Sequence, residues 1–201
     1  SGNWIAHGDP LGTLAKLQSS YCTIRLTNEA GEEVEQDEVG EVWLRSPTLF
    51  SGYWDDVAAT EAAFDGDWYH MGDDFRRTPD GLLNFADRSK YLIKSGGENI
   101  YPSEIEIVLR NMDGIVDAVV VRRPDTRWGE VPIAFVVGTP DGTPAETEIR
   151  ERLQAQIARY KLPKEIHFLA EHEIERNGTG KIRRDLLEQR ALLSAGKTGS
   201  N

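Results

Sequence analysis

The segment from Asp87 to Glu106 constrains the fold of this chain more than any other. It opens with the charged side chains Arg88 and Lys90, continues into a glycine pair at positions 96–97, and then reaches Pro102. Glycine tolerates positive φ and close backbone approach, and proline favours the first position of a helix. The segment therefore predicts a tight polar turn followed directly by a helix. A chain built in this way bends at that place or shapes its backbone around a ligand.

The distribution of charge changes at the same place. Residues 1–88 hold 6 basic and 17 acidic side chains and so account for the whole net charge of −11, whereas residues 89–201 are balanced. We expect two units that meet near residue 88. The acidic first unit argues against binding to nucleic acids or anionic membranes, because both need clustered Lys and Arg. An acidic surface that only aids solubility is the alternative.

The first unit is expected to be mostly antiparallel β-structure in short strands. Alternating residues predict a hairpin of strands 21–27 and 39–45, and a second hairpin of strands 73–77 and 82–86 around a Thr-Pro-Asp-Gly turn. Between the two hairpins, residues 54–64 predict a short surface helix with Val57, Ala58 and Ala62 on its apolar side.

The second unit reads as strands and helices in the order β-β-α-β-β-α-β-α. Strands are expected at 115–123, 131–137 and 165–169, and helices from 102, from 143 and over 182–193. The middle helix is predicted to start at a capping box of Thr143 and Glu146. This order predicts the α+β class, with a short, mostly antiparallel sheet flanked by helices.

The loop Asn177–Lys181 places a lysine after two glycines, in a segment expected to be flexible. A lysine ammonium is a compact charge that suits an oxyanion or a phosphate, and glycine lets the backbone come close to it. The spacing of a nucleotide-binding P-loop is absent. An exposed turn with a solvated lysine is the alternative.

Asp73 follows a glycine behind the aromatic run Trp68-Tyr-His. A carboxylate there could accept two hydrogen bonds from adjacent hydroxyls, as on a ribose, or could bind backbone N–H groups at a turn. Arg88 and Lys90 would point to the same side of an extended segment and bind one anion, or they are solvated linker charges. The glycine pair gives backbone access to a narrow ligand channel or only makes a turn.

Other kinds of site are not predicted. The histidines, at positions 7, 70, 167 and 172, lack the spacing of metal ligands, so no metal site is expected. The single cysteine, Cys22, excludes an internal disulfide and favours a reducing, cytosolic setting. No apolar run is long enough to predict a transmembrane segment.

Taken in order, several segments resemble the adenylate-forming (AMP-binding) superfamily, which includes acyl-CoA synthetases, peptide-synthetase adenylation domains and firefly luciferase. The matching segments are Gly40–Pro47 with Gly52–Trp54, Trp68–Asp73, Asp87–Glu106, Tyr160–Pro163 and Asn177–Lys181. Each is weak alone, but together they follow the order and approximate spacing of the family's motifs. Three positions depart from the pattern: Met71 replaces a usual threonine, Glu175 replaces a common proline, which would loosen the lysine loop, and Asp87 replaces a frequent glycine, a variant that the family also uses.

The resemblance implies a role for each matching residue. Asp73 corresponds to the carboxylate that binds the ribose hydroxyls of AMP, and Arg88 to an arginine that contacts the nucleotide. Lys90 corresponds to the hinge between a large and a small domain. Lys181 corresponds to the lysine that bridges the substrate carboxylate and the α-phosphate. Gly96-Gly97 corresponds to the loop that lines the pantetheine channel of CoA after domain rotation.

The resemblance also implies a fold and an activity. Residues 1–88 would be the β-barrel-like end of the large N-terminal domain, and residues 89–201 the small mobile C-terminal domain. The parent would be an AMP-forming acid–CoA ligase for fatty or aromatic acids, using ATP, CoA and Mg²⁺. Most of the N-terminal domain is expected to precede this chain, so the chain alone is not expected to turn over. The alternatives are an adenylation domain that loads a carrier protein and a non-catalytic nucleotide-binding or interaction fragment.

Overall fold

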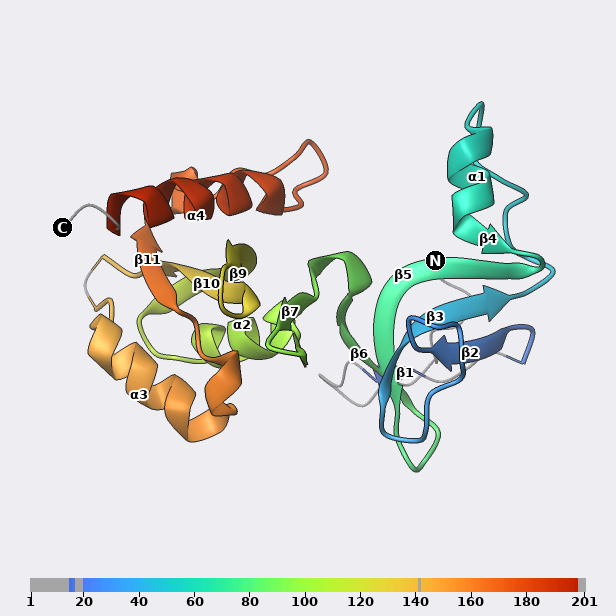
Figure 1. Cartoon of the computed structure of the whole chain (residues 1–201), viewed down its shortest axis with the longest axis horizontal. Helices are drawn as coiled ribbons and strands as arrows, with labels where there is room; N and C mark the ends of the chain where they lie inside the picture. The colour runs from blue at the N-terminus through green and yellow to red at the C-terminus, as the bar shows by residue number, and fades with distance from the viewer. Residues whose placement is uncertain (1–14, 17–19, 141, 199–201) are drawn as a thin grey trace. The chain divides into compact units, whose positions relative to one another are not determined.

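The structure is a computed structural model that describes residues 15–16, 20–140 and 142–198, so His7 lies outside the described part (Figure 1). The chain divides into two compact units, Ser1–Lys90 and Tyr91–Asn201. The charge pattern placed the change near residue 88, within the last residues of the first unit. Each unit is described by itself.

The first unit is an antiparallel sheet with the strand order β1-β6-β5-β3-β2, with β4 paired to β5. Its long strand β5 bends strongly, which curls the sheet (Figure 1). The elements are β1 (Ala15–Lys16), β2 (Thr23–Thr27), β3 (Val39–Arg45), α1 (Val57–Ala63), β4 (Phe64–Asp65), β5 (Trp68–Arg77) and β6 (Leu83–Arg88). Both predicted hairpins are present, as β2–β3 and β5–β6.

The apolar residues of this unit meet on one face of the curled sheet, because alternate residues of β2 and β3 point the same way. Buried members of that core include Ile24, Val42 and Phe75. Helix α1 contributes nothing to it: none of its residues is buried, and Val57 is 72% exposed. The apolar side predicted for this helix is therefore not covered within the first unit.

The second unit has a sheet built around β10 (Gly129–Gly138). This strand pairs antiparallel with β9 (Ile115–Asp125) and parallel with β11 (Glu165–Leu169), and its first residue pairs with β7. The short strands β7 (Ile93–Ser95) and β8 (Glu98–Ile100) form an antiparallel hairpin. The helices are α2 (Pro102–Arg110), α3 (Glu146–Gln156) and α4 (Arg184–Thr198), with 3-10 turns η2 (Arg159–Lys161) and η3 (Glu171–Glu173). A further 3-10 turn, η1 (Ser89–Tyr91), includes the last two residues of the first unit and the first residue of the second. The predicted α+β class, with a mostly antiparallel sheet flanked by helices, is confirmed.

Helices pack on both faces of this sheet, which explains why β9 and β10 read as almost continuous apolar runs. On one face, Val120 and Val136 pack in a cluster with residues of α2 and α3. On the other face, Val119 and Phe135 pack in a cluster with residues of α4. The helix expected from residue 102 is present as α2, and its Ile105 and Leu109 are fully buried. Each such side chain stabilises the fold by about 1.5–3 kcal/mol.

The predicted capping box at the start of α3 is wrong. The residue that precedes the helix is Ala145, and no side chain caps the helix there. The hydroxyl of Thr143 donates instead to the carbonyl oxygen of Thr139 at 2.8 Å. The hydroxyl is therefore used by the turn before the helix, and the helix begins at Glu146. The last helix also differs from its predicted limits, since it starts at Arg184 and runs to Thr198.

Candidate functional site

In the first unit, Asp73 and Arg88 lie directly opposite each other on the antiparallel strands β5 and β6. Their side chains form an ion pair with 3.0 Å between Arg88 Nε and Asp73 Oδ1. The Asp73 side chain is only 14% exposed, whereas that of Arg88 is 45% exposed. The structure thus brings together the two residues that sequence analysis assigned separately to the nucleotide.

The backbone just before Asp73 is irregular, and a carboxylate holds it. Gly72 has φ of +71°, a conformation that only glycine adopts readily, and its N–H donates to Glu41 Oε1 at 3.2 Å. The pairing of β3 with β5 shifts register beside Glu41, and that of β5 with β6 shifts beside Asp74. These bulges redirect the strand where it presents Asp73. Glu41 lies in the motif Gly40–Pro47, and the sequence alone indicated no role for it.

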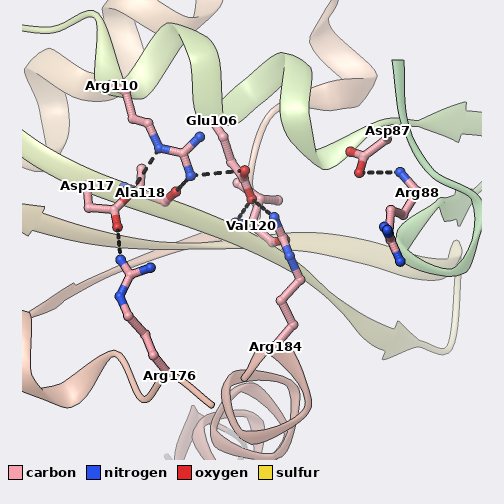
Figure 2. Close-up of polar contacts among 9 residues, drawn as sticks. All are labelled: Asp87, Arg88, Glu106, Arg110, Asp117, Ala118, Val120, Arg176 and Arg184. Carbon is pink, nitrogen blue, oxygen red and sulfur yellow. Dashed lines mark hydrogen bonds and ion pairs between the residues drawn. The ribbon is translucent and has the colours of Figure 1, made fainter. Parts of the chain in front are cut away.

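Two further acids form the next opposed pair along β5 and β6 and were not predicted. Asp74 and Asp87 oppose each other in the register, and both are buried. Asp74 Oδ1 accepts a hydrogen bond from the Ser89 hydroxyl at 2.5 Å. Asp87 Oδ1 accepts one from the backbone N–H of Arg88 at 2.7 Å, which Figure 2 shows. Burial raises the pKa of Asp74 to about 6; nearby acids add to the rise, and the bond from Ser89 opposes it.

Lys90 does not extend the strand that carries Arg88. Strand β6 ends at Arg88, and residues 89–91 form the 3-10 turn η1. Side chains two residues apart share a side in a strand but not in a 3-10 turn. The expectation that Arg88 and Lys90 point to one anion from an extended segment is therefore wrong.

In the second unit, the glycine pair forms the two-residue turn between β7 and β8. Gly96 has φ of +60° and Gly97 has φ of +88°, as a type I′ turn requires. The N–H of Gly96 donates to the carbonyl oxygen of Trp128 at 2.8 Å. The Trp128 ring covers Gly96 so closely that an added Cβ would lie 2.8 Å from it, whereas a Cβ on Gly97 would meet nothing within 4 Å.

The segment 177–181 is an ordered turn, not the flexible loop expected. The Asn177 side chain accepts hydrogen bonds from the backbone N–H groups of Thr179 and Lys181, each at 3.0 Å. The N–H of Asn177 also donates to the carbonyl oxygen of Lys181 at 2.8 Å, and Gly180 supplies a positive φ of +81°. Lys181 itself is exposed. Its backbone is fixed while its ammonium faces solvent.

The Tyr160–Pro163 segment also has a defined place. Its first two residues belong to the turn η2, and Lys161 pairs with Glu104 near the start of α2. Within residues 15–16, 20–140 and 142–198, no group of three or more His, Cys, Asp and Glu residues is arranged to hold a metal ion. In the same ranges, no helix is long and apolar enough to cross a membrane.

Part of the second unit matches a known protein family. Residues 104–181 match the AMP-binding enzyme C-terminal domain, from α2 to the lysine of the ordered turn. Over residues 104–181 the chain belongs to the AMP-binding enzyme C-terminal domain family. The sequence motifs had indicated this family, and those at Tyr160–Pro163 and Asn177–Lys181 lie within the matched residues; the identification is confirmed.

Relatives among the AMP-binding enzymes include ligases for aromatic and fatty acids. The chain is 39% identical to the indoleacetate–CoA ligase of Aromatoleum aromaticum, over 84% of this chain and 33% of that protein. It is 41% identical to a long-chain-fatty-acid–CoA ligase of Mycobacterium tuberculosis, over 75% and 29% respectively. The chain therefore spans about a third of the length of the curated relatives it matches.

A solved structure shares the fold. The o-succinylbenzoate–CoA synthetase of Bacillus subtilis, in complex with its acyl-adenylate intermediate, superimposes with a TM-score of 0.80 at 31% identity. The match covers 87% of this chain and 35% of that one.

Proposed function

We propose that the protein to which this chain belongs is an ATP-dependent, AMP-forming acid–CoA ligase. In the first step, a carboxylate attacks the α-phosphorus of ATP, giving an acyl-adenylate and pyrophosphate. In the second, the CoA thiol attacks the acyl carbon, forming a thioester and releasing AMP and a proton. The observation that carries the proposal is the Asp73–Arg88 pair, in a chain whose relatives are CoA ligases.

Asp73 and Arg88 supply complementary groups for a nucleotide. The Asp73 carboxylate accepts hydrogen bonds, so we assign it to the ribose hydroxyls of AMP. The Arg88 guanidinium donates them, and it is assigned to the nucleotide alongside. The bulge at Gly72 and its hydrogen bond to Glu41 fix where the Asp73 carboxylate lies. Little conformational entropy is therefore lost when a ribose binds.

Lys181 is assigned to adenylate formation. Two anions, the substrate carboxylate and the α-phosphate, must approach each other, and negative charge develops in the transition state. A positioned ammonium lowers that barrier through electrostatic stabilisation. The hydrogen-bonded turn around Asn177 supports this role, because it fixes the backbone from which the lysine stem extends.

Thioester formation is assigned to a different surface of the second unit. The turn Gly96-Gly97 is assigned to the pantetheine arm of CoA, and the open space beside Gly97 leaves room for it, whereas the Trp128 ring covers Gly96. The first unit would be the distal end of the large domain and the second the small mobile domain, with Lys90 as the hinge between them. Domain rotation about a few residues is a known way for one active site to perform two steps.

The substrate and cofactors follow the relatives. The acid is proposed to be aromatic or fatty, since ligases of both kinds match at similar identity. Mg²⁺ is the expected companion of ATP, but the described residues offer no cluster that would hold it. No residue of this chain is therefore assigned to the metal. The single cysteine supports a cytosolic setting for the enzyme.

Two other functions make different predictions. An adenylation domain would pass its acyl group to a carrier protein instead of free CoA, so a carrier domain would follow this region and CoA would not release AMP. A non-catalytic nucleotide-binding module would bind ATP or AMP without acid-dependent release of pyrophosphate. Measuring pyrophosphate release and thioester formation separately distinguishes all three.

The test uses the full-length protein and a panel of aromatic and fatty acids. Pyrophosphate release should depend on one class of acid, and CoA should then release AMP. Lys181→Ala should abolish adenylate formation but spare thioester formation from supplied acyl-adenylate. Lys164→Ala is the matched control, because Lys164 is an exposed lysine that pairs with Asp125 and has no assigned role. The assignment of Lys181 is wrong if both half-reactions survive its removal.

A further inference from the structure

Lys181 lies between two arginines that reach back into the body of the second unit. Arg176, just before the ordered turn, donates from Nη2 to Asp117 Oδ2 on β9 at 2.9 Å. The same guanidinium donates from Nη1 to the carbonyl oxygen of Gly180 at 3.2 Å. One side chain thus ties the residue next to Lys181 to the sheet (Figure 2).

Arg184, the first residue of α4, forms the second attachment. Its Nη2 lies 2.7 Å from Glu106 Oε1 on α2, and its Nη1 donates to the carbonyl oxygen of Val120 at 2.6 Å. The Glu106 side chain is only 4% exposed, and its Oε1 also accepts the backbone N–H of Val120 at 2.8 Å. Burying a carboxylate this deeply costs desolvation free energy, and the charged and polar groups around Glu106 offset that cost.

Arg110 joins the two attachments. It donates from Nε to Asp117 Oδ1 at 2.9 Å and from Nη2 to Glu106 Oε2 at 3.2 Å. Figure 2 shows the resulting chain of alternating charges, from Arg176 through Asp117, Arg110 and Glu106 to Arg184. Planar guanidinium groups fix the direction of each contact. This series of ion pairs therefore holds the residues on both sides of Lys181, Arg176 and Arg184, in one orientation.

We propose that Asp117 and Arg176 are positioning residues for Lys181, and that the buried Glu106 anchors them through Arg110. This inference rests on the proposed function, in which Lys181 stabilises adenylate formation. The lysine stem is long and flexible, so the place of its backbone decides which anions its ammonium reaches. Neither Asp117 nor Arg176 is assigned to substrate; both act through the backbone beside Lys181.

The first test asks whether the anchor exists, whatever the enzyme does. In the 201-residue chain, Arg176→Gln should speed hydrogen exchange at the backbone N–H groups of Thr179, Gly180 and Lys181. Arg190→Gln is the matched control: its pair with Glu173 is also 2.9 Å long, and its side chain is 48% exposed against 49% for Arg176. Equal exchange in the turn for both variants would overturn the proposal.

The second test asks whether the anchor matters for one step only. In the full-length protein, Arg176→Gln should lower kcat for adenylate formation by about 10- to 100-fold, the loss that follows from a displacement of about 1 Å. The KM for ATP and the rate of thioester formation from supplied acyl-adenylate should stay near wild type. A purely structural role would lower both half-reactions together and would overturn the proposal.

Asp117→Asn provides a second route if Arg176→Gln does not fold. It keeps the size of the side chain and an oxygen acceptor while removing the charge that Arg176 contacts, so it should reproduce the selective loss. The failure modes are separable. Absence of acid-dependent pyrophosphate release by the wild type would refute the proposed function. A wild-type enzyme that is active, with Arg176→Gln equal to Arg190→Gln, would refute only the positioning role.

Discussion

Gly96→Ala should cost more stability than Gly97→Ala, although the two residues are neighbours in one turn. Both have positive φ, which costs an L-amino acid about 1–2 kcal/mol. Gly97→Ala should cost only that amount, because its Cβ would enter open space. Gly96→Ala adds an approach of 2.8 Å to the Trp128 ring. Since that residue is 45% exposed and its ring can move, the added cost is about 1 kcal/mol, near the lower limit for overpacking.

Urea unfolding followed by the far-ultraviolet helix signal measures these costs, since α2, α3 and α4 belong to the second unit. Trp128→Ala supplies the control. In that background the collision is absent, so Gly96→Ala and Gly97→Ala should cost the same. Fluorescence gives an independent readout as the difference between variant and wild-type spectra, because Trp128 is the one tryptophan of five that lies in residues 91–201. Gly96→Ala should shift its emission, and Gly97→Ala should not.

Two results would refute this reasoning. If Gly97→Ala were as stable as the wild type, the turn would not need positive φ at that position. If Gly96→Ala kept its extra cost in the Trp128→Ala background, the collision with the ring would not be its cause.

Three further predictions follow from other parts of the chain. Asp74→Asn should stabilise the protein by about 1–2 kcal/mol at neutral pH. The raised pKa of Asp74 lowers stability as pH rises from 3.8 to about 6, so urea midpoints of the variant should lack that decline. Glu165→Gln should destabilise by about 1–3 kcal/mol, because Arg123, 6% exposed, loses its charged partner. The hydrogen bond and charge of Arg123 lower the pKa of Glu165, so this contribution to wild-type stability is lost as pH falls below 4.5. The difference in unfolding free energy between the wild type and Glu165→Gln should therefore narrow over that range. Lys90→Pro should slow CoA transfer at least tenfold in the full-length enzyme while sparing adenylate formation, and unchanged transfer in a thioester assay would contradict the hinge assignment.

Local pattern predicted most of the fold because the spacing of apolar residues matches how each element is covered, on one face in β2 and β3 and on both faces in β9 and β10. The alternation over 39–45 follows from a sheet with one covered face, and the spacing of Ile105 and Leu109 follows from a helix packed on a sheet. The local sequence pattern gave a wrong prediction where one side chain had two possible hydrogen-bond partners. Thr143 could have capped α3, but its hydroxyl bonds to the preceding turn.

Sequence reasoning identified the charged residues of the candidate site but not their supports. Glu106 looks like a solvent-facing acid among the polar residues at the start of α2, yet it is buried because Arg184 reaches it from a distant part of the sequence. Asp74 and Asp87 were missed for the same reason, since only the pairing of β5 with β6 brings them together. Long-range contacts decide whether a charge is buried, and a local pattern contains no record of them.

Helix α2 has a consequence for protein engineering. It begins just after the hairpin that carries Gly96-Gly97, and through Glu106 and Arg110 it holds the segment that carries Lys181. A chimera that exchanges only the glycine hairpin and α2 between two ligases would import a carboxylate fitted to one arginine and present it to another. Exchange boundaries should therefore keep residues 93–120 together with 176–184, as one transplantable piece.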